Sequence, residues 1–284
     1  MSTHTDGLGL SSSALPLLRD LVHEHAGLFY DNLRLDTLAD RLSPLVVDRG
    51  FASFLDYYYL LKYDDASAEE WRRVMDALSV PETYFWREID QVQAIVRDVV
   101  PGLLARGPGP LRIWSVPCAT GEEPLTIAMV LEEAGLFARG TIEIHASDAS
   151  PAAIDKARSG RFRERAFRSL PPHLRDRYFS RNGDGWIVHP SLQQRITSWS
   201  VLNLLSEPSV APLARAPIVF CRNLFIYFSP ASIAQVVGQL ERTMPTPGYL
   251  CLGAAESLMR LRTGFELEEI GGAFVYVKRE RATA

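Results

Sequence analysis

Apolar residues recur at the spacing of an α-helix through residues 14–80. Leucine, valine and aromatic side chains gather on one face of each stretch, which is typical of amphipathic helices. The stretches that show this pattern are 14–28, 33–50, 51–63 and 67–79. Pro44 lies inside the second stretch and should break or kink that helix, because proline has no backbone N–H. The pattern and the short connections predict a small all-helical domain.

The pattern changes after residue 80. Residues 81–110 hold the segment PETYFWRE, one more helical pattern, and ARGPGP, a stop rich in glycine and proline. From residue 111 onward, short apolar strands alternate with helical patterns. We predict strands at 111–116, 141–146, 217–221 and 248–253, and helices at 123–134, 151–159 and 230–242. Ser150-Pro151 and Ser229-Pro230 each offer a capping serine and a proline at the first helical position. Repeated strand–helix units predict a parallel, doubly wound sheet.

Two stretches depart from this alternation. FELEEI, GG and AFVYVKRE near the end of the chain predict a hairpin, so the last strand should be antiparallel. Residues 160–202 contain a short helical pattern, the turn RNGDG and strand-like segments, which predict a small inserted β-subdomain. The predicted fold of residues 111–284 is α/β, with a mostly parallel, Rossmann-like sheet closed by an antiparallel hairpin. This arrangement resembles the fold of class I methyltransferases. We interpret residues 1–13 as a disordered lead-in.

Composition narrows the class of protein. The chain has 284 residues, a net charge of −4 and 47% hydrophobic residues, which is ordinary for a globular protein and gives no sign of general nucleic-acid binding. Its three cysteines are widely spaced, so neither a disulfide framework nor a zinc site is predicted. We see no signal peptide and no apolar stretch of about 18 residues that could cross a membrane. We therefore expect a cytoplasmic protein.

The turn WSVPCATGEEP carries the chemistry. A strand, a turn and a helix in this order hold nucleotides in many proteins, yet Glu122 and Glu123 follow Gly121 directly and would repel a phosphate. Carboxylates suit a cation such as an amine or a sulfonium. Asp148 ends the next strand, where an acid can accept hydrogen bonds from ribose hydroxyls. The combination indicates S-adenosylmethionine. The alternatives are dipole stabilisation by the glutamates and helix capping by Asp148.

Longer motifs carry a resemblance to a known family. SVPETYFWRE, IWSVPCATGEEP, ASDASPAAIDKARSGRF, VLNLL and IVFCRNLFIYFSP resemble those of the CheR-type chemotaxis protein methyltransferases, in the family's order and spacing. The resemblance implies methylation of glutamate side chains on chemoreceptors, forming methyl esters in a sensory adaptation pathway. The implied cofactor is S-adenosylmethionine, and the implied partner is the cytoplasmic helical domain of methyl-accepting chemoreceptors. We expect a monomer that neither binds nucleic acid nor inserts into a membrane.

The resemblance also implies roles for particular residues. Those that would bind the cofactor are Thr83, Arg87, Glu123, Asp148, Asn203, Leu204, Arg222 and Asn223. Glu123 would bind the methionine amine, with Glu122 as the nearby alternative, and Asp148 would hold the ribose. Arg87 and Tyr227 would flank the reacting methyl group as catalytic residues, and no metal is required.

The remaining cofactor contacts come in pairs. The resemblance implies that Asn203 and Leu204 line the adenine and that Arg222 and Asn223 lie near the methionine. Pro81 departs from the family pattern, which commonly has asparagine there, and proline cannot supply an amide. Trp86 replaces a usual phenylalanine, and the short SRNGDG loop argues against docking of a receptor peptide by the subdomain.

Two alternatives stay open from the sequence. One is a methyltransferase for a different substrate, and the other is a non-catalytic module that binds the cofactor or a receptor. Arg34, Arg41 and Arg49 fall on one helical segment and would suit an acidic receptor helix, or would form an ordinary solvated face.

Overall fold

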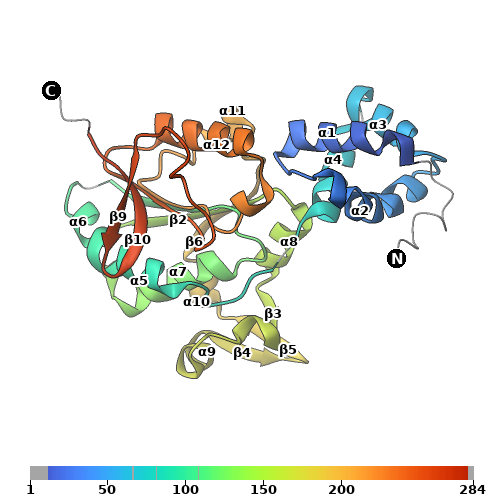
Figure 1. Cartoon of the computed structure of the whole chain (residues 1–284). Helices are drawn as coiled ribbons and strands as arrows, with labels where there is room; N and C mark the ends of the chain where they lie inside the picture. The colour runs from blue at the N-terminus through green and yellow to red at the C-terminus, as the bar shows by residue number, and fades with distance from the viewer. Residues whose placement is uncertain (1–11, 66, 81, 108, 281–284) are drawn as a thin grey trace.

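The computed structural model describes residues 12–65, 67–80, 82–107 and 109–280. Residues 1–11, which make up most of the predicted lead-in, and Pro81 lie outside the described residues. A helical domain lies beside a larger domain built on a twisted sheet, and a small β-subdomain projects from the larger domain (Figure 1).

The helical domain is formed by four α-helices among the described residues: α1 (Leu15–Ala26), α2 (Leu35–Asp48), α3 (Phe54–Tyr63) and α4 (Ser67–Leu78). Their apolar faces meet in a separate core that includes Leu18, Leu42, Phe54 and Val74. Helix α2 runs unbroken through Pro44, so the prediction of a break there is wrong. Pro44 is exposed, and the carbonyl that lacks its hydrogen bond can bind water instead.

The larger domain contains, within the described part of the chain, a seven-stranded sheet in the order β6-β2-β1-β7-β8-β10-β9. Its strands are β1 (Leu111–Ser115), β2 (Ile142–Asp148), β6 (Ile196–Val201), β7 (Ile218–Phe220), β8 (Gly248–Cys251), β9 (Phe265–Ile270) and β10 (Ala273–Lys278). Strands β6, β2, β1, β7 and β8 pair in parallel, whereas β10 pairs antiparallel with both β8 and β9. The predicted parallel sheet with an antiparallel terminal hairpin is confirmed.

The helices predicted at 123–134, 151–159 and 230–242 are present as α7 (Glu122–Glu133), α8 (Pro151–Ser159) and α12 (Pro230–Thr243). The helical pattern before residue 111 forms α5 (Ile89–Ala94), a π-helical turn, Ile95–Val99, and α6 (Val100–Leu104). The short helix α11 (Glu207–Val210) is not among the helices predicted from the sequence. The Ser150 hydroxyl accepts a hydrogen bond from Ala153 N at 3.0 Å, and the Ser229 hydroxyl accepts one from Ser232 N at 3.1 Å. Both predicted serine caps are therefore present.

The β-subdomain is smaller than predicted. Strands β3 (Arg161–Arg163), β4 (Phe179–Asn182) and β5 (Gly185–Val188) form an antiparallel sheet, flanked by α9 (Pro172–Tyr178) and α10 (Pro190–Gln193). The prediction that the insertion runs to about residue 202 is wrong at its end, because β6 pairs in parallel with β2 at the edge of the main sheet. A chain that returns from an insertion can complete the sheet it left.

The segment between the two domains is fixed by Phe85, which is fully buried. Its ring lies 4.8–5.0 Å, centroid to centroid, from the rings of Phe162, Phe167 and Phe179. Its backbone N–H also donates to Ala166 O at 2.9 Å. The residues on either side of Phe85 are thereby held against the β-subdomain.

Candidate active site

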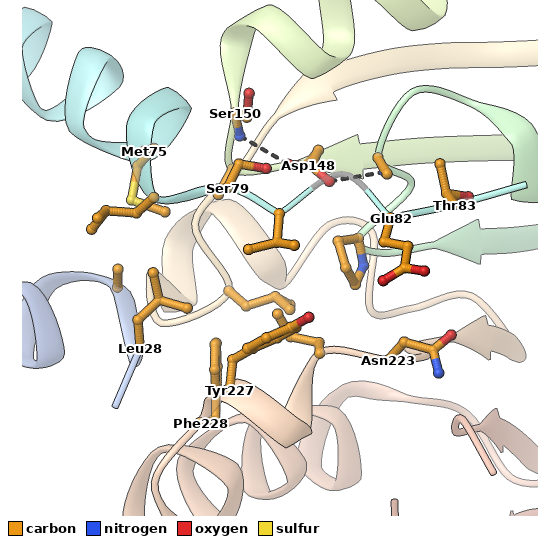
Figure 2. A pocket seen from close by; sticks show the side chains of 18 of the residues that line it. Leu28, Met75, Ser79, Glu82, Thr83, Asp148, Ser150, Asn223, Tyr227 and Phe228 are labelled. Atoms are coloured by element: carbon orange, nitrogen blue, oxygen red, sulfur yellow. Dashed lines mark hydrogen bonds between the residues drawn. The ribbon is translucent and has the colours of Figure 1, made fainter. Parts of the chain in front are cut away.

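A cavity of about 380 Å³ lies between the helical domain and the carboxyl ends of the parallel strands. Figure 2 shows its lining, with Leu28 and Met75 from the helical domain facing Tyr227 and Asp148 of the sheet domain. Every residue predicted to bind the cofactor or act in catalysis lines this cavity: Thr83, Arg87, Glu123, Asp148, Asn203, Leu204, Arg222, Asn223 and Tyr227. The fold therefore brings together residues that are far apart in the sequence.

The turn after β1 needs a glycine at position 121. Gly121 has φ of 99°, a left-handed conformation, and a Cβ there would lie 3.1 Å from both the Ala157 Cβ and the Trp199 ring. The turn therefore fits tightly against α8 and β6. Helix α7 starts directly after Gly121, so that Glu122 and Glu123 occupy its first turn.

The two glutamates face different surroundings. Glu123 lines the cavity, where its Oε1 accepts from the Ser115 hydroxyl at 2.7 Å and its Oε2 accepts from Arg222 Nε at 2.7 Å. The Glu122 carboxylate accepts from the Thr120 hydroxyl at 2.7 Å, and burial raises its pKa. Glu122 does not contribute to the described lining of the cavity. The geometry favours Glu123 as the acid that meets a cationic ligand.

Asp148, at the end of β2, is both a structural residue and a cavity residue. Its Oδ2 accepts from Ala119 N at 2.9 Å and its Oδ1 from Ser150 N at 2.9 Å, as the dashed lines of Figure 2 show. Burial raises its pKa, while these backbone hydrogen bonds oppose the rise. The helix-capping alternative is not observed for Asp148, because Ser150 is the cap of α8 and neither donor to Asp148 belongs to the first turn of that helix. Each carboxylate oxygen of Asp148 retains a lone pair for a further donor.

Arg87 and Tyr227 reach the cavity from distant parts of the sequence, the segment before α5 and the loop after β7. Arg87 Nη1 donates to Glu82 O at 2.8 Å, and its Nε lies 3.7 Å from Glu88 Oε1. Tyr227 extends into the cavity in Figure 2, and its hydroxyl has no hydrogen-bond partner among the described residues. A cationic group and a free hydroxyl are therefore available to an incoming ligand.

Asn203 joins the two domains at the edge of the cavity. Its Nδ2 donates to His25 O at 2.6 Å, and its Oδ1 accepts from Leu205 N at 3.0 Å. Leu204 beside it is buried and supplies an apolar surface. The side-chain amide of Asn203 is thus already engaged, so its neighbourhood offers a ligand mainly shape and backbone groups.

Two glutamates that sequence reasoning missed organise the loop after β7. Glu256 Oε2 accepts from Asn223 N at 2.8 Å and Gly253 N at 2.7 Å, while its Oε1 accepts from Phe225 N at 2.6 Å. Burial raises the pKa of Glu256, and these hydrogen bonds counter that rise. Glu88 accepts from Asn223 Nδ2 at 3.3 Å. The position of Glu256 after β8, at the carboxyl edge of the sheet, was the available sequence signal.

Arg222 connects this loop to the segment that carries Arg87. It is 5% exposed, and its Nη2 and Nη1 donate to Arg87 O at 2.9 Å and Glu88 O at 3.0 Å. Burial alone would lower its pKa, but the neighbouring Glu123 carboxylate outweighs burial and raises it. Arg222 is therefore a permanent cation that ties Glu123 to the backbone around Arg87.

Backbone strain gathers around the same cavity. Among the described residues, the non-glycine positions with positive φ are Trp86, Glu88, Ala119 and Asn223, at 70°, 46°, 45° and 60°. Ala119 and Asn223 line the cavity, and Trp86 and Glu88 flank Arg87. Such conformations persist only where the surroundings enforce them, and they concentrate at functional sites.

Arg34, Arg41 and Arg49, which lie before, within and after α2, do not form one free basic face. Arg49 is paired with the buried Glu70, its Nε donating to Glu70 Oε2 at 2.7 Å. Arg41 Nη1 donates to Leu78 O at 2.9 Å, at the end of α4. Arg34 is exposed and lines the cavity with Arg41. Arg49 is exposed but already paired with Glu70, and Arg41 with the end of α4, so a docking face made by all three arginines stays a prediction.

Other reactive groups are few. Cys118, Cys221 and Cys251 are buried free thiols, and burial raises their pKa values, that of Cys251 to about 12. The residues that the structure describes contain no group of three or more His, Cys, Asp or Glu side chains arranged to hold a metal. No helix in that part of the chain is both long enough and apolar enough to span a membrane.

Comparison with known proteins shows two family matches that together cover most of the chain. Residues 13–79 match the model described as CheR methyltransferase, all-alpha domain, and residues 81–272 match the CheR methyltransferase, SAM binding domain. The chain is 34% identical to chemotaxis protein methyltransferase 2 of Vibrio cholerae over 263 residues, 92% of this chain and 91% of the relative. It is 28% identical to the chemotaxis protein methyltransferase of Escherichia coli, covering 93% and 91%.

A third relative has a name that refers to biofilm formation. The chain is 32% identical to the probable biofilm formation methyltransferase WspC of Pseudomonas putida, over 93% of this chain and 61% of that protein. The match therefore leaves about two fifths of that relative uncovered.

Proposed function

The chain belongs to the CheR methyltransferase family, and on that premise we propose that it methylates glutamate side chains of chemoreceptors. It is an S-adenosylmethionine-dependent methyltransferase. The observation that carries the substrate proposal is the shared cavity, in which Glu123 and Asp148 suit the cofactor while Arg87 offers a cation for a carboxylate. The product is a glutamate methyl ester.

The residues of the cavity fit this cofactor. Its volume of about 380 Å³ lies in the range of small-molecule sites. The Glu123 carboxylate would bind the methionine amine and the Asp148 carboxylate the ribose, since each has lone pairs in addition to its present contacts. Leu204 would pack against the adenine. When bound, the cofactor supplies a methyl group activated by its sulfonium.

Methyl transfer to a glutamate carboxylate requires no proton transfer from the protein. A glutamate carboxylate, with an unperturbed pKa of about 4.3, is already ionised at neutral pH and needs no general base. Positioning and exclusion of water then supply most of the rate enhancement. We assign Arg87 to orienting the incoming carboxylate and the Tyr227 hydroxyl to a hydrogen bond at the reacting centre. The helical domain excludes water from the other side of the cavity.

The family and the names of its members support the proposed partner. Relatives from Vibrio cholerae and Escherichia coli are named chemotaxis protein methyltransferases. We therefore propose that this chain acts as a monomer in the cytoplasm on the cytoplasmic helical domain of methyl-accepting receptors, in a chemosensory pathway. Binding of a receptor peptide by the subdomain is not part of the proposal, because the β4–β5 turn consists of Gly183 and Asp184 alone.

A transfer assay tests the proposal. Purified full-length chain is incubated with radiolabelled S-adenosylmethionine and the cytoplasmic fragments of receptors from its own genome. We expect label in at least one fragment, and release of that label by mild alkali, as for a methyl ester. Label that enters only small molecules or other proteins would indicate a different methyltransferase, and cofactor binding without any transfer would indicate a non-catalytic module.

A further inference from the structure

The arginines of the β-subdomain divide into paired and unpaired groups. Arg175 and Arg181 each lie 3.4 Å from a Glu164 carboxylate oxygen, and Arg177 lies 2.9 Å from Glu133 Oε1. Arg165 and Arg168, by contrast, have no carboxylate within ion-pair distance among the residues that the structure describes. Both are exposed. We call these two residues the mouth arginines because of their position.

Arg168 stacks on a residue that lines the cavity. The Arg168 guanidinium lies 3.6 Å from the centre of the Tyr84 ring, and Tyr84 lines the cavity. Arg87 approaches the same ring at 5.7 Å. The stacking of Arg168 on Tyr84 thus extends the positive charge of Arg87 outward from the cavity onto the β-subdomain.

Arg165 comes three residues before Arg168 in the sequence. It belongs to the helical turn Glu164–Phe167, which is fixed to the segment before α5 by the hydrogen bond from Phe85 N to Ala166 O. Arg168 Nη1 donates to Arg165 O at 3.2 Å, which holds the two arginines together in this turn. The turn that carries both mouth arginines is therefore fixed to the segment next to Tyr84, which lines the cavity.

Exposed cations in one turn that lack a carboxylate partner among the described residues are suited to an external anion. Guanidinium groups bind carboxylates in a planar, two-pronged geometry, and stacking on an aromatic ring orients that plane without consuming its N–H donors. The proposed substrate is itself a carboxylate on a helical segment. Carboxylates three or four residues from the target on such a helix would lie on the same face as the target.

We propose that Arg165 and Arg168 bind carboxylates flanking the target glutamate on an acidic helical segment of the substrate. This inference rests on the proposed function and adds the surface that selects the substrate. The Glu82 side chain at the cavity would favour segments whose carboxylates point toward the β-subdomain rather than toward Glu82.

The test uses the full chain with both mouth arginines reversed, Arg165→Glu with Arg168→Glu, and steady-state kinetics on a methylatable receptor fragment. We expect KM for the fragment to rise about tenfold at low salt. The value of kcat and the affinity for S-adenosylhomocysteine should stay unchanged. The difference should shrink as ionic strength rises, because exposed charges are screened.

Two further variants control for charge and folding. Arg106→Glu with Arg139→Glu makes the same change in net charge at exposed positions before β1 and β2, near the amino ends of these strands, where neither arginine has an ion pair among the described residues. Arg165→Lys with Arg168→Lys keeps the charges and should keep most of the affinity. If the Arg165/Arg168 variant has the same KM as the Arg106/Arg139 control, this inference is wrong, and the proposed function is unaffected. Absence of transfer by the unaltered chain contradicts the proposed function, and this inference with it.

Discussion

At the scale of single residues, the arrangement around Glu123 explains how an acid can serve at the start of α7. The Ser115 hydroxyl and Arg222 fix its carboxylate inside the cavity, whereas Glu122 is turned toward Thr120. A negative charge at a helix N-terminus is stabilised by the helix dipole, which suits this position to an acid that meets a cation.

The two glutamates should therefore differ in their effect on cofactor binding. We predict that Glu123→Gln weakens binding of S-adenosylhomocysteine by roughly tenfold to 100-fold, since it removes a charged hydrogen-bond acceptor from the amine. Glu122→Gln should change the affinity by less than about threefold, because Glu122 lies outside the described lining. Titration calorimetry checks both, with thermal melting to verify folding. A larger loss from Glu122→Gln would reverse the assignment.

The Tyr227 hydroxyl can be removed without breaking a hydrogen bond of the described fold. Its hydroxyl has no described partner, so Tyr227→Phe should preserve the fold and the cofactor affinity. We expect kcat to fall about three- to tenfold, the value of one ordinary hydrogen bond. The measurement is kcat for methyl transfer beside the cofactor Kd. Loss of cofactor binding with kcat unchanged would show that Tyr227 is a binding residue instead.

At the scale of elements, the loop after β7 depends on one buried acid. Glu256 accepts hydrogen bonds from the backbone of Asn223 and Phe225, which hold Asn223 at a φ of 60° beside the cavity. The charge of a buried carboxylate is tolerated here because several backbone donors point at it.

We predict that Glu256→Gln lowers both the melting temperature and kcat, because the amide nitrogen of glutamine would face a backbone donor. A loss of about 1–3 kcal/mol in unfolding free energy is expected for one unsatisfied buried group. Glu269→Gln, at an exposed position on β9, is the matched control. Equal melting temperatures and equal kcat for the two variants would contradict this role.

The helical domain contains a second buried acid, Glu70, whose pKa is lowered, whereas that of Glu256 is raised. Burial would raise the pKa of Glu70, but hydrogen bonds from Arg49 and Tyr57 outweigh it and lower the pKa. Its stabilisation is therefore complete above the unfolded pKa of about 4.3 and is lost as the pH falls through the lower folded value.

Glu70→Gln should accordingly destabilise the chain at pH 7, by about 1–3 kcal/mol, and the difference from the unaltered chain should narrow in acid. Melting curves recorded from pH 7 down to about pH 3 measure this. Asp36→Asn, which alters an exposed acid of α2, should show no such dependence. A difference in stability between the two chains that stays constant with pH would mean that Glu70 acts through its shape rather than its charge.

Local patterns predicted most elements, and long-range contacts account for what they missed. The sequence predicts Ser150 and Ser229 as helix caps because each cap is a hydrogen bond between residues only three positions apart. Strand β6 was assigned to the insertion, since its polar sequence ITSWSV does not reveal that β2 is its partner. The role of Glu256 depends on backbone donors up to 33 residues away, which no spacing rule encodes.

At the scale of the whole molecule, the cavity exists only because the two domains dock. The Ser150 hydroxyl donates to Asp76 Oδ1 at 2.6 Å, and His23 Nε2 lies 2.8 Å from the Ser229 hydroxyl. Phe29 N also donates to Tyr227 O at 2.8 Å. The helical domain thus contacts the N-termini of α8 and α12, and cofactor binding should stabilise the docked arrangement by mass action.

The central claim is that this docked molecule places a methyl group on a glutamate side chain. Mass spectrometry of a receptor fragment after incubation with the chain and S-adenosylmethionine tests it most directly. We predict one added methyl on a glutamate, removed by mild alkali and absent when that glutamate is replaced by alanine. A methyl group found on another residue type, or one that resists alkali, would contradict the account.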